Sequence, residues 1–250
     1  MRFKDKLVIV TGGGRDIGRS ISLRFAAEGA KVVINYRGDE AAAQDTLAAV
    51  QASGGTALLH RADVTKPDAV AGLIAAAAEF GGGTIDVLVN CAGGMVARKT
   101  LAEMDEAFFD TVMDLNFKSA FLVTKAALPH LAKGSAIVNL SSQAARDGGG
   151  PGASIYAASK GAMTTLTRSW AKELGPQGIR VNALCPGLIG TSFHDTFSKP
   201  EGRAATAGNT PLRREGHPDE VAGAVAFLAS DDAAFLTGLN MDINGGLAFS

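Results

Sequence analysis

The strongest constraint on the fold is a regular alternation, along the whole chain, between short apolar runs and longer segments rich in Ala and Leu. The run KLVIVTG at residues 6–12 is the first of seven such apolar runs. Each is nearly continuous in Val, Ile, Leu and Ala, a pattern typical of strands buried on both faces of a parallel sheet. The segments between them have the length of helices. This alternation predicts a doubly wound α/β fold, with one seven-stranded parallel sheet and helices on both of its faces.

The sequence contains no linker and no internal repeat, so we expect a single domain over residues 1–250. The predicted strands cover residues 6–12, 31–36, 56–64, 85–93, 135–142, 179–187 and 239–245. The predicted helices cover residues 17–28, 39–52, 67–80, 103–131, 154–174 and 218–229. The most irregular stretch is 188–217, which is rich in Gly, Thr, Pro and charged residues. A long loop after a sheet strand often covers a substrate, so we expect a substrate lid there.

The composition excludes several classes of protein. Hydrophobic residues make up 46% of the chain, and 24 basic against 25 acidic residues leave a formal net charge of −1. No basic stripe indicates nucleic-acid binding, and the longest apolar run, 69–78, is too short to span a membrane. The first residues do not follow the plan of a signal peptide, and Cys91 and Cys185 do not form a C-x-x-C pair. We therefore expect a cytoplasmic protein with two reduced thiols.

A glycine-rich stretch, TGGGRDIG at 11–18, follows the first predicted strand and opens the first predicted helix. Glycine allows a tight turn and a close approach of the backbone to a ligand, and the helix then offers free N–H groups to a phosphate. A tight strand–helix connection without a ligand is the alternative. The strand and helix on either side favour a site for the pyrophosphate of a dinucleotide.

The end of the second predicted strand bears on which dinucleotide would bind. An acidic residue there would accept hydrogen bonds from the ribose hydroxyls of NAD, but the chain has Asn35, Tyr36 and Arg37. An arginine favours the 2′-phosphate of NADP, and Arg15 could approach the same phosphate. We therefore expect NADP(H) to be preferred and NAD(H) to be possible. If the strand were longer, Asp39 could instead reach a ribose hydroxyl.

A tyrosine and a lysine four residues apart, Tyr156 and Lys160, lie one turn apart on one face of a predicted helix. A phenol has an ordinary pKa of about 10, and a neighbouring ammonium should lower that pKa toward neutral pH. The pair could then exchange a proton with a substrate. Standing alone, such a pair is more often a contact on a helix surface, and only its position among the other motifs favours chemistry.

Taken together, these motifs resemble those of the short-chain dehydrogenase/reductase family over essentially the full length of the chain. TGGGRDIG resembles the TGxxxGxG coenzyme turn of the family, NCAG at 90–93 its NNAG segment, and YAASK at 156–160 its YxxxK motif. Asp63–Val64, Asn116, the Pro186–Gly187 pair and NGG at 244–246 also fall in the family's order. The resemblance implies a Rossmann-type fold, a nicotinamide coenzyme and a homotetramer, with one interface made by helices 103–131 and 154–174 and another by the C-terminal segment.

The resemblance also implies roles for individual residues. The catalytic set is Asn116, Ser142, Tyr156 and Lys160. Tyr156 exchanges a proton with the substrate oxygen, Ser142 fixes that oxygen, Lys160 holds the nicotinamide ribose, and Asn116 holds a water that links Lys160 to solvent. Ser142 is preferred to Ser141, which should point to the other side of the strand. The coenzyme-binding set is Gly12, Gly14, Arg15, Asp16, Ile17, Gly18, Tyr36, Arg37, Asp63, Val64, Asn90, Ala92, Gly93, Tyr156, Lys160, Pro186, Gly187, Ile189 and Thr191.

The chain departs from the family pattern at two positions. Asp16 stands where the middle glycine of TGxxxGxG is expected. Aspartate tolerates unusual backbone angles, so the turn should survive, provided that the carboxylate points away from the pyrophosphate. Cys91 replaces the second asparagine of NNAG and should pack without difficulty.

These observations predict an NADPH-dependent oxidoreductase that acts on a ketone or a secondary alcohol. Two substrate classes stay open: a 3-oxoacyl thioester, and a sugar or keto-uronate that Arg98, Gln143, Arg146 and His194 could recognise. The two arginines could equally be solvated charges or subunit contacts. An NADP-binding sensor without turnover is the alternative function. A hydrolase or a metal site is not indicated, because the chain has no G-x-S-x-G or H-E-x-x-H motif.

Overall fold

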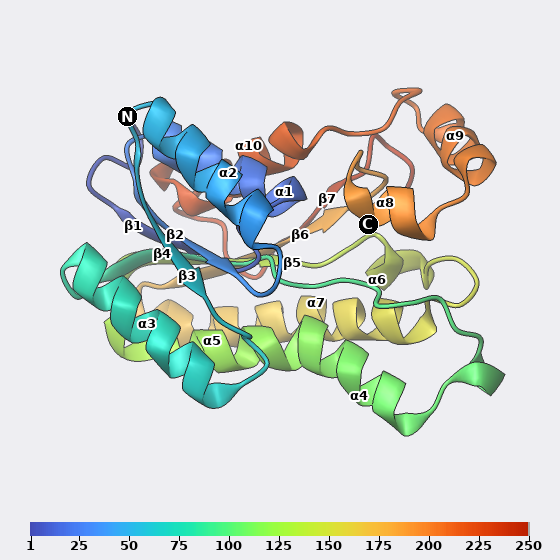
Figure 1. Ribbon diagram of the computed structural model, residues 1–250, viewed down its shortest axis with the longest axis horizontal. Helices are drawn as coiled ribbons and strands as arrows, with labels where there is room; N and C mark the ends of the chain where they lie inside the picture. The colour runs from blue at the N-terminus through green and yellow to red at the C-terminus, as the bar shows by residue number, and fades with distance from the viewer. Residues whose placement is uncertain (250) are drawn as a thin grey trace.

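Seven parallel strands form one sheet in the order β3-β2-β1-β4-β5-β6-β7 in the computed structural model, which describes residues 1–249 (Figure 1). Each strand pairs in parallel with its neighbours. The predicted fold class and strand number are confirmed. The strands are β1 Leu7–Val10, β2 Lys31–Tyr36, β3 Thr56–Arg61, β4 Ile85–Asn90, β5 Leu131–Leu140, β6 Arg180–Pro186 and β7 Asn240–Ile243.

Helices cover both faces of the sheet. One layer consists of α1 (Asp16–Ala27), α2 (Glu40–Ala52) and α10 (Pro218–Ala229), drawn above the sheet in Figure 1. The other layer, below the sheet, consists of α3 (Pro67–Gly81), α4 (Glu106–Met113), α5 (Ser119–Ala127) and α7 (Ser154–Leu174). Helices α7 and α10 have the predicted boundaries.

The side-chain alternation of each strand divides the core into two apolar clusters, one on each face of the sheet. In β1, Val8 and Val10 pack with Phe25 of α1. Leu7 and Ile9 point to the other face and belong to the cluster between the sheet and helices α3 and α5. All five side chains are essentially inaccessible to water. Burying a side chain of this size contributes about 1.5–3 kcal/mol, so both faces of the sheet stabilise the fold.

The prediction of a single helix over residues 103–131 is wrong. Helix α4 begins at Glu106, because the Asp105 carboxylate accepts a hydrogen bond from the N–H of Phe108 and caps the helix there. A π-helical turn at Asp114–Lys118 separates α4 from α5, and a 3₁₀ turn at Leu128–His130 leads directly into β5. A π-turn inserts an extra residue into a helix and often marks a functional site.

The expected loop at 188–217 is also more regular than predicted. It contains two helices, α8 (Ser192–Phe197) and α9 (Pro200–Asn209). Pro200 occupies the first turn of α9, where a missing N–H costs nothing. A short helix, α6 (Ala144–Asp147), follows β5 and was not predicted. Figure 1 shows α8 and α9 beyond one end of the sheet, near α6.

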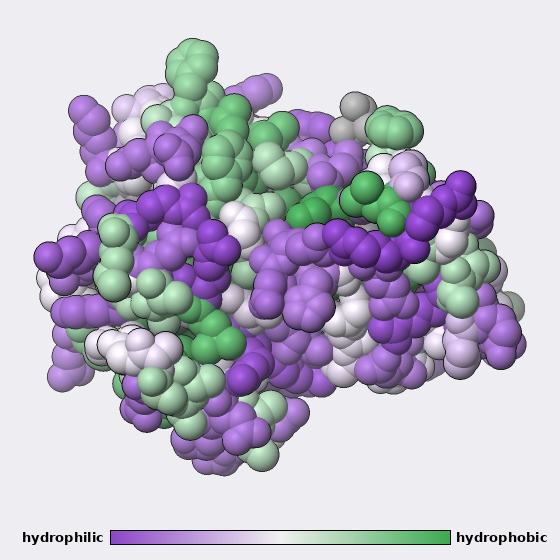
Figure 2. All heavy atoms as spheres, turned by 90° about the horizontal axis from the view of Figure 1, so that it is seen from above, coloured by the Kyte–Doolittle hydropathy of each residue, from purple (hydrophilic) through white to green (hydrophobic). Residues whose placement is uncertain are grey.

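The surface that carries α1, α2 and α10 is seen from above in Figure 2. Hydrophilic side chains dominate this face, and smaller apolar patches interrupt them, as expected for helices that turn only one stripe toward the core. Within residues 1–249, no helix combines the length and the apolar character that crossing a membrane requires.

Candidate active site

A cleft of about 1090 Å³ lies at the carboxyl ends of the strands. In an open α/β sheet, ligands bind where the strand order changes direction, which here is between β1 and β4. The cleft brings together nearly all of the predicted site residues, from segments far apart in the sequence. Its walls include Gly12, Gly14, Arg15, Asp16, Ile17, Gly18, Tyr36, Arg37, Asp63, Val64, Ala92, Gly93, Ser142, Tyr156, Lys160, Pro186, Gly187, Ile189 and Thr191.

Two glycines of the first turn are poorly suited to a side chain, Gly18 for lack of room and Gly12 because of its backbone conformation. A Cβ atom on Gly18 would lie 2.0 Å from the carbonyl oxygen of Gly12, and Gly12 itself has a φ of +64°. Helix α1 therefore begins directly against the turn. No side chain caps its first residues, so its N-terminal N–H groups are available to an anion in the cleft.

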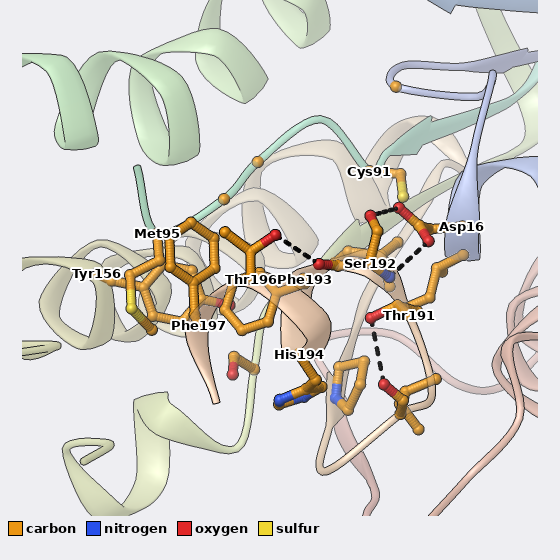
Figure 3. A pocket seen from close by; sticks show the side chains of 18 of the residues that line it. Asp16, Cys91, Met95, Tyr156, Thr191, Ser192, Phe193, His194, Thr196 and Phe197 are labelled. Carbon is orange, nitrogen blue, oxygen red and sulfur yellow. Dashed lines mark hydrogen bonds between the residues drawn. The ribbon is translucent and has the colours of Figure 1, made fainter. Parts of the chain in front are cut away.

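Asp16 keeps the backbone conformation that a glycine would have, with a φ of +50°. Its carboxylate points across the cleft to Ser192, the first residue of α8 (Figure 3). One oxygen accepts a hydrogen bond from the Ser192 N–H at 3.0 Å, and the other accepts from the Ser192 hydroxyl at 2.6 Å. The glycine turn thus accommodates an aspartate, and the charge of that aspartate is directed toward the start of α8.

The end of β2 presents Arg37 to the cleft. The strand ends at Tyr36, as predicted, and the exposed Arg37 follows it. Asp39 accepts a hydrogen bond from the N–H of Ala42 and caps α2. The longer strand is therefore not formed, although Asp39 still lines the cleft.

The tyrosine–lysine pair lies at the start of α7, where both side chains face the cleft. The Lys160 Nζ donates a hydrogen bond to the carbonyl oxygen of Leu140 at 2.8 Å and lies 5.9 Å from the centre of the Tyr156 ring. Burial lowers the pKa of Lys160 to about 8. Burial also raises the pKa of Tyr156, and a hydrogen bond with Ser142 offsets only part of that rise. The expected lowering of the Tyr156 pKa by the ammonium is therefore wrong: burial raises this pKa, and Lys160 is not among the groups that lower it.

The two serines after β5 face different surroundings. Ser141 is buried and donates its hydroxyl to the main-chain oxygen of Lys160 at 2.8 Å. Ser142 lies at the cleft and contacts Tyr156. The geometry thus places Ser142, and not Ser141, beside the phenol.

Two predicted asparagines are not in the wall of the cleft. Asn90 is buried at the end of β4, where its amide N–H groups donate to Thr124 at 3.0 Å and to Asn139 at 2.8 Å. It fastens β4 to α5 and β5 beneath the cleft, so the prediction that it contacts the coenzyme is not supported by this geometry. Its place in a run that ends at the cleft gave no sign of which way the side chain turns.

Asn116 lies in the π-turn and is almost completely buried. Its amide exchanges two hydrogen bonds of 2.8 Å with the backbone of Gly94 and donates a third to Val112 at 2.9 Å. A Cβ atom on Gly93 would lie 2.8 Å from the Asn116 Oδ1 and 2.9 Å from the Lys160 Nζ. Asn116 and Lys160 therefore both lie against Gly93.

An apolar wall beside Tyr156 was missed by the sequence analysis. The ring of Phe193 lies 5.8 Å from that of Tyr156 and 5.1 Å from that of Phe197, and Met95 lies close to this group (Figure 3). The spacing of Phe193 and Phe197, four residues apart, is that of one helix face and could have indicated α8.

The basic residues suggested for sugar recognition are largely used within the protein. Arg98 lines the cleft, but it donates to the main-chain oxygens of Phe197 at 2.9 Å and Pro151 at 2.8 Å. Arg146 is not in the cleft wall and pairs with Asp242 at 3.1 Å. Burial, with the nearby Arg203, lowers the pKa of His194, which favours its neutral form.

Metal and thiol chemistry have no support among the described residues. Residues 1–249 contain no group of three or more His, Cys, Asp or Glu side chains arranged to hold a metal ion. Cys91 and Cys185 are both free thiols. Burial raises the pKa of Cys91 to about 12, so its thiol stays protonated in the cleft.

Comparisons with known proteins agree with this geometry. The family model described as enoyl-(acyl carrier protein) reductase matches residues 12–248. Glucose 1-dehydrogenase 2 of Bacillus subtilis is 36% identical over 97% of this chain and 94% of its own length. The 3-oxoacyl-[acyl-carrier-protein] reductase of Staphylococcus aureus is 38% identical over 97% and 98%. The crystal structure of a short-chain dehydrogenase from Burkholderia cenocepacia in complex with NADP is 34% identical, covers 99% of both chains and superposes with a TM-score of 0.93.

Burial of the Lys160 ammonium predicts how the free energy of unfolding depends on pH, and the test needs no coenzyme. Its pKa is about 8 in the folded chain, against an ordinary value of 10.5, so the unfolded chain binds more protons between these pH values. Stability should therefore rise with pH over this window by about 3 kcal/mol on account of this group. The Lys160→Met variant should lack this rise when unfolding by urea is measured from pH 7 to 10.5. Lys172→Met, at an exposed lysine of the same helix, is the control and should follow the wild type. Parallel curves for Lys160→Met and wild type would contradict the assignment.

Proposed function

The chain belongs to the short-chain dehydrogenase/reductase family of NAD(P)-dependent oxidoreductases, and we propose that it uses NADPH to reduce a ketone with apolar substituents. The reverse reaction is oxidation of the matching secondary alcohol. The observation that carries this proposal is that Ser142, Tyr156 and Lys160 line the same cleft as the glycine turn and Arg37.

The residues of the cleft fit a nicotinamide dinucleotide. Gly12 and Gly18 leave the backbone bare at the turn, and the uncapped start of α1 suits a pyrophosphate. Arg37 and Arg15, both exposed, would hold the 2′-phosphate of NADP, and the Lys160 ammonium would hold the ribose next to the nicotinamide. When bound, NADPH supplies the hydride for the carbonyl carbon.

The chain itself supplies the proton and holds the carbonyl oxygen. Tyr156 is the general acid, and its raised pKa keeps the phenol protonated, which is the form that donates to an oxygen. The Ser142 hydroxyl, beside the phenol, donates to the same oxygen and fixes its position. Lys160, with a pKa of about 8, is suited to pass protons onward near neutral pH. We assign Asn116 to this relay as the residue that holds Gly93 and Gly94 beside the ammonium.

The walls around Tyr156 bear on the choice between the two substrate classes. Phe193, Phe197 and Met95 make an apolar surface next to the phenol. Arg98 uses two of its five N–H donors on main-chain oxygens, and Arg146 is outside the cleft, so few of the basic groups suggested for a sugar or a uronate face the substrate. These observations support the acyl chain of a 3-oxoacyl thioester over a keto-sugar.

Coenzyme oxidation across a panel of ketones tests the proposal. The panel includes a 3-oxoacyl thioester, simple diketones, keto-sugars and keto-uronates. We expect the thioester or an apolar ketone to be the best substrate. Tyr156→Phe should lower kcat by about 10²–10⁴-fold, because general acid catalysis has that magnitude, while NADPH still binds.

Two serine variants provide a matched pair for this assay. Ser142→Ala should lower kcat by about 10²-fold or more through loss of a donor to the oxygen. Ser141→Ala removes only the hydrogen bond to the Lys160 main chain and should keep most of the activity. A preference for keto-sugars would contradict the apolar substrate, and NADPH binding without turnover of any ketone would favour a sensor module.

The NADPH preference rests on Arg37. Removing a charge-assisted contact to a phosphate costs about 1.5–3 kcal/mol, so Arg37→Ala should raise the KM for NADPH by about 10–150-fold. The KM for NADH, which has no 2′-phosphate, should change little and is the internal control. A wild-type enzyme that works better with NADH would overturn this assignment.

We also propose that the chain forms a homotetramer. Phe109 of α4, Phe121 of α5 and Leu128 are 45%, 42% and 37% exposed on the layer that the family likeness assigns to an interface, and Phe249 near the C-terminus is 90% exposed. Apolar side chains gathered on one surface favour association. Sedimentation velocity should give four times the 25.5 kDa mass of the chain. A species of 25.5 kDa at micromolar concentration would contradict the proposal.

A further inference from the structure

The short helix α8 is held at both of its ends by charged side chains from distant parts of the chain. At its first residue, Ser192, the Asp16 carboxylate accepts hydrogen bonds from the main-chain N–H at 3.0 Å and from the hydroxyl at 2.6 Å. At its last residue, Phe197, the Arg98 Nε donates to the main-chain oxygen at 2.9 Å. Figure 3 shows the contact between Asp16 and Ser192.

Both charges have the sign that a helix requires. A carboxylate is favourable at an N-terminus and a cation at a C-terminus, because the unpaired N–H and C=O groups there carry partial charges of opposite sign. A helix of six residues is too short to be stable by itself. Its N-cap residue, Thr191, makes no side-chain cap, so Asp16 takes over that function from the far side of the cleft.

Asp16 holds an unfavourable backbone conformation in order to make these contacts. Its φ of +50° lies in the left-handed region, which is unfavourable for a residue with a Cβ atom relative to the right-handed region. Glycine would avoid this cost, but it has no carboxylate for Ser192.

Helix α8, held at both ends in this way, carries Phe193 and Phe197, which belong to the apolar wall beside Tyr156. Phe193 follows Ser192 directly, and its ring lies 5.8 Å from that of Tyr156. Phe197, held by Arg98, packs on Phe193 at 5.1 Å. The position of Ser192 therefore determines where Phe193 lies relative to the proposed general acid.

We propose that Asp16 is a positioning residue that holds the substrate lid over the cleft. Through Ser192 it holds α8 across the cleft and sets Phe193 against Tyr156. The two hydrogen bonds between Asp16 and Ser192, called the clasp below, do not depend on which reaction the protein catalyses. Their effect on catalysis rests on the proposed function.

Hydrogen exchange of the coenzyme-free protein, followed by mass spectrometry over residues 192–197, tests the clasp directly. Asp16→Gly removes the carboxylate and suits the backbone, so the variant should fold. We expect at least about 10-fold faster exchange over 192–197 in this variant, the loss of hydrogen bonds worth about 1.5–3 kcal/mol to a charged group. Asp16→Asn keeps one acceptor oxygen and should be intermediate.

Asp5→Gly is the matched control. Asp5 also has a positive φ, of 63°, and it is exposed and absent from the cleft wall. This variant removes a carboxylate from the same backbone conformation and should leave exchange over 192–197 unchanged. Equal protection of these residues in wild type and Asp16→Gly would overturn the clasp.

Steady-state kinetics then test the positioning role. In Asp16→Gly we expect the KM for the best ketone to rise about 10-fold with kcat changed less than about threefold, since the acid, the serine and the lysine remain in place. Asp16→Asn should recover part of the loss. Faster exchange without a change in KM would overturn the positioning role. If the wild type turned over no ketone, the proposed function would fail, whereas the exchange result would still decide the clasp.

Discussion

Parallel direction of all seven strands is the constraint on which the site depends. Because each strand ends at the same edge of the sheet, the residues that follow β1, β2, β4, β5 and β6 meet there although they lie far apart in the sequence. Gly12, Arg37, Ala92, Ser142 and Gly187 all reach the cleft in this way. The reversal of strand order between β1 and β4 separates the helices on the two faces and leaves the crevice open.

Burial of polar groups at this edge of the sheet reduces the stability of the fold and shifts the pKa values of two residues in the site. The Lys160 ammonium is nearly inaccessible to water, and its hydrogen bond to Leu140 replaces only part of its hydration, as its lowered pKa shows. The same burial keeps the Tyr156 phenol protonated. An acid with a raised pKa and a base with a lowered pKa often occur together in catalytic sites. Here the loss of water causes both shifts.

Local signals predicted the regular elements well. The boundaries of α7, α10 and β2 follow from the periodicity and the end residues of their own segments, and the structure confirms them. The features that the sequence did not reveal depend on distant partners. The π-turn lies where Asn116 binds Gly94, and Arg146 turns to Asp242, 96 residues away. The Tyr156 pKa depends on burial, which no spacing of two residues in a helix can indicate.

The orientation of the Asp16 carboxylate matters both for the phosphate site in the glycine turn and for the start of α8. In the glycine turn, a carboxylate aimed at the phosphate site would repel a bound pyrophosphate, and at a few ångströms this repulsion amounts to several kcal/mol at the effective dielectric of a protein surface. The hydrogen bonds to Ser192 direct that charge toward two donors at the start of α8. The contacts that we propose to hold the lid are therefore also the contacts that make an acidic residue compatible with the turn. A glycine in this position would remove the repulsion by removing the charge, but it would leave the start of α8 with only the 3.4 Å contact from the Arg15 guanidinium to the Ser192 hydroxyl. The departure from the glycine pattern is thus best understood through the lid, 176 residues further along the chain.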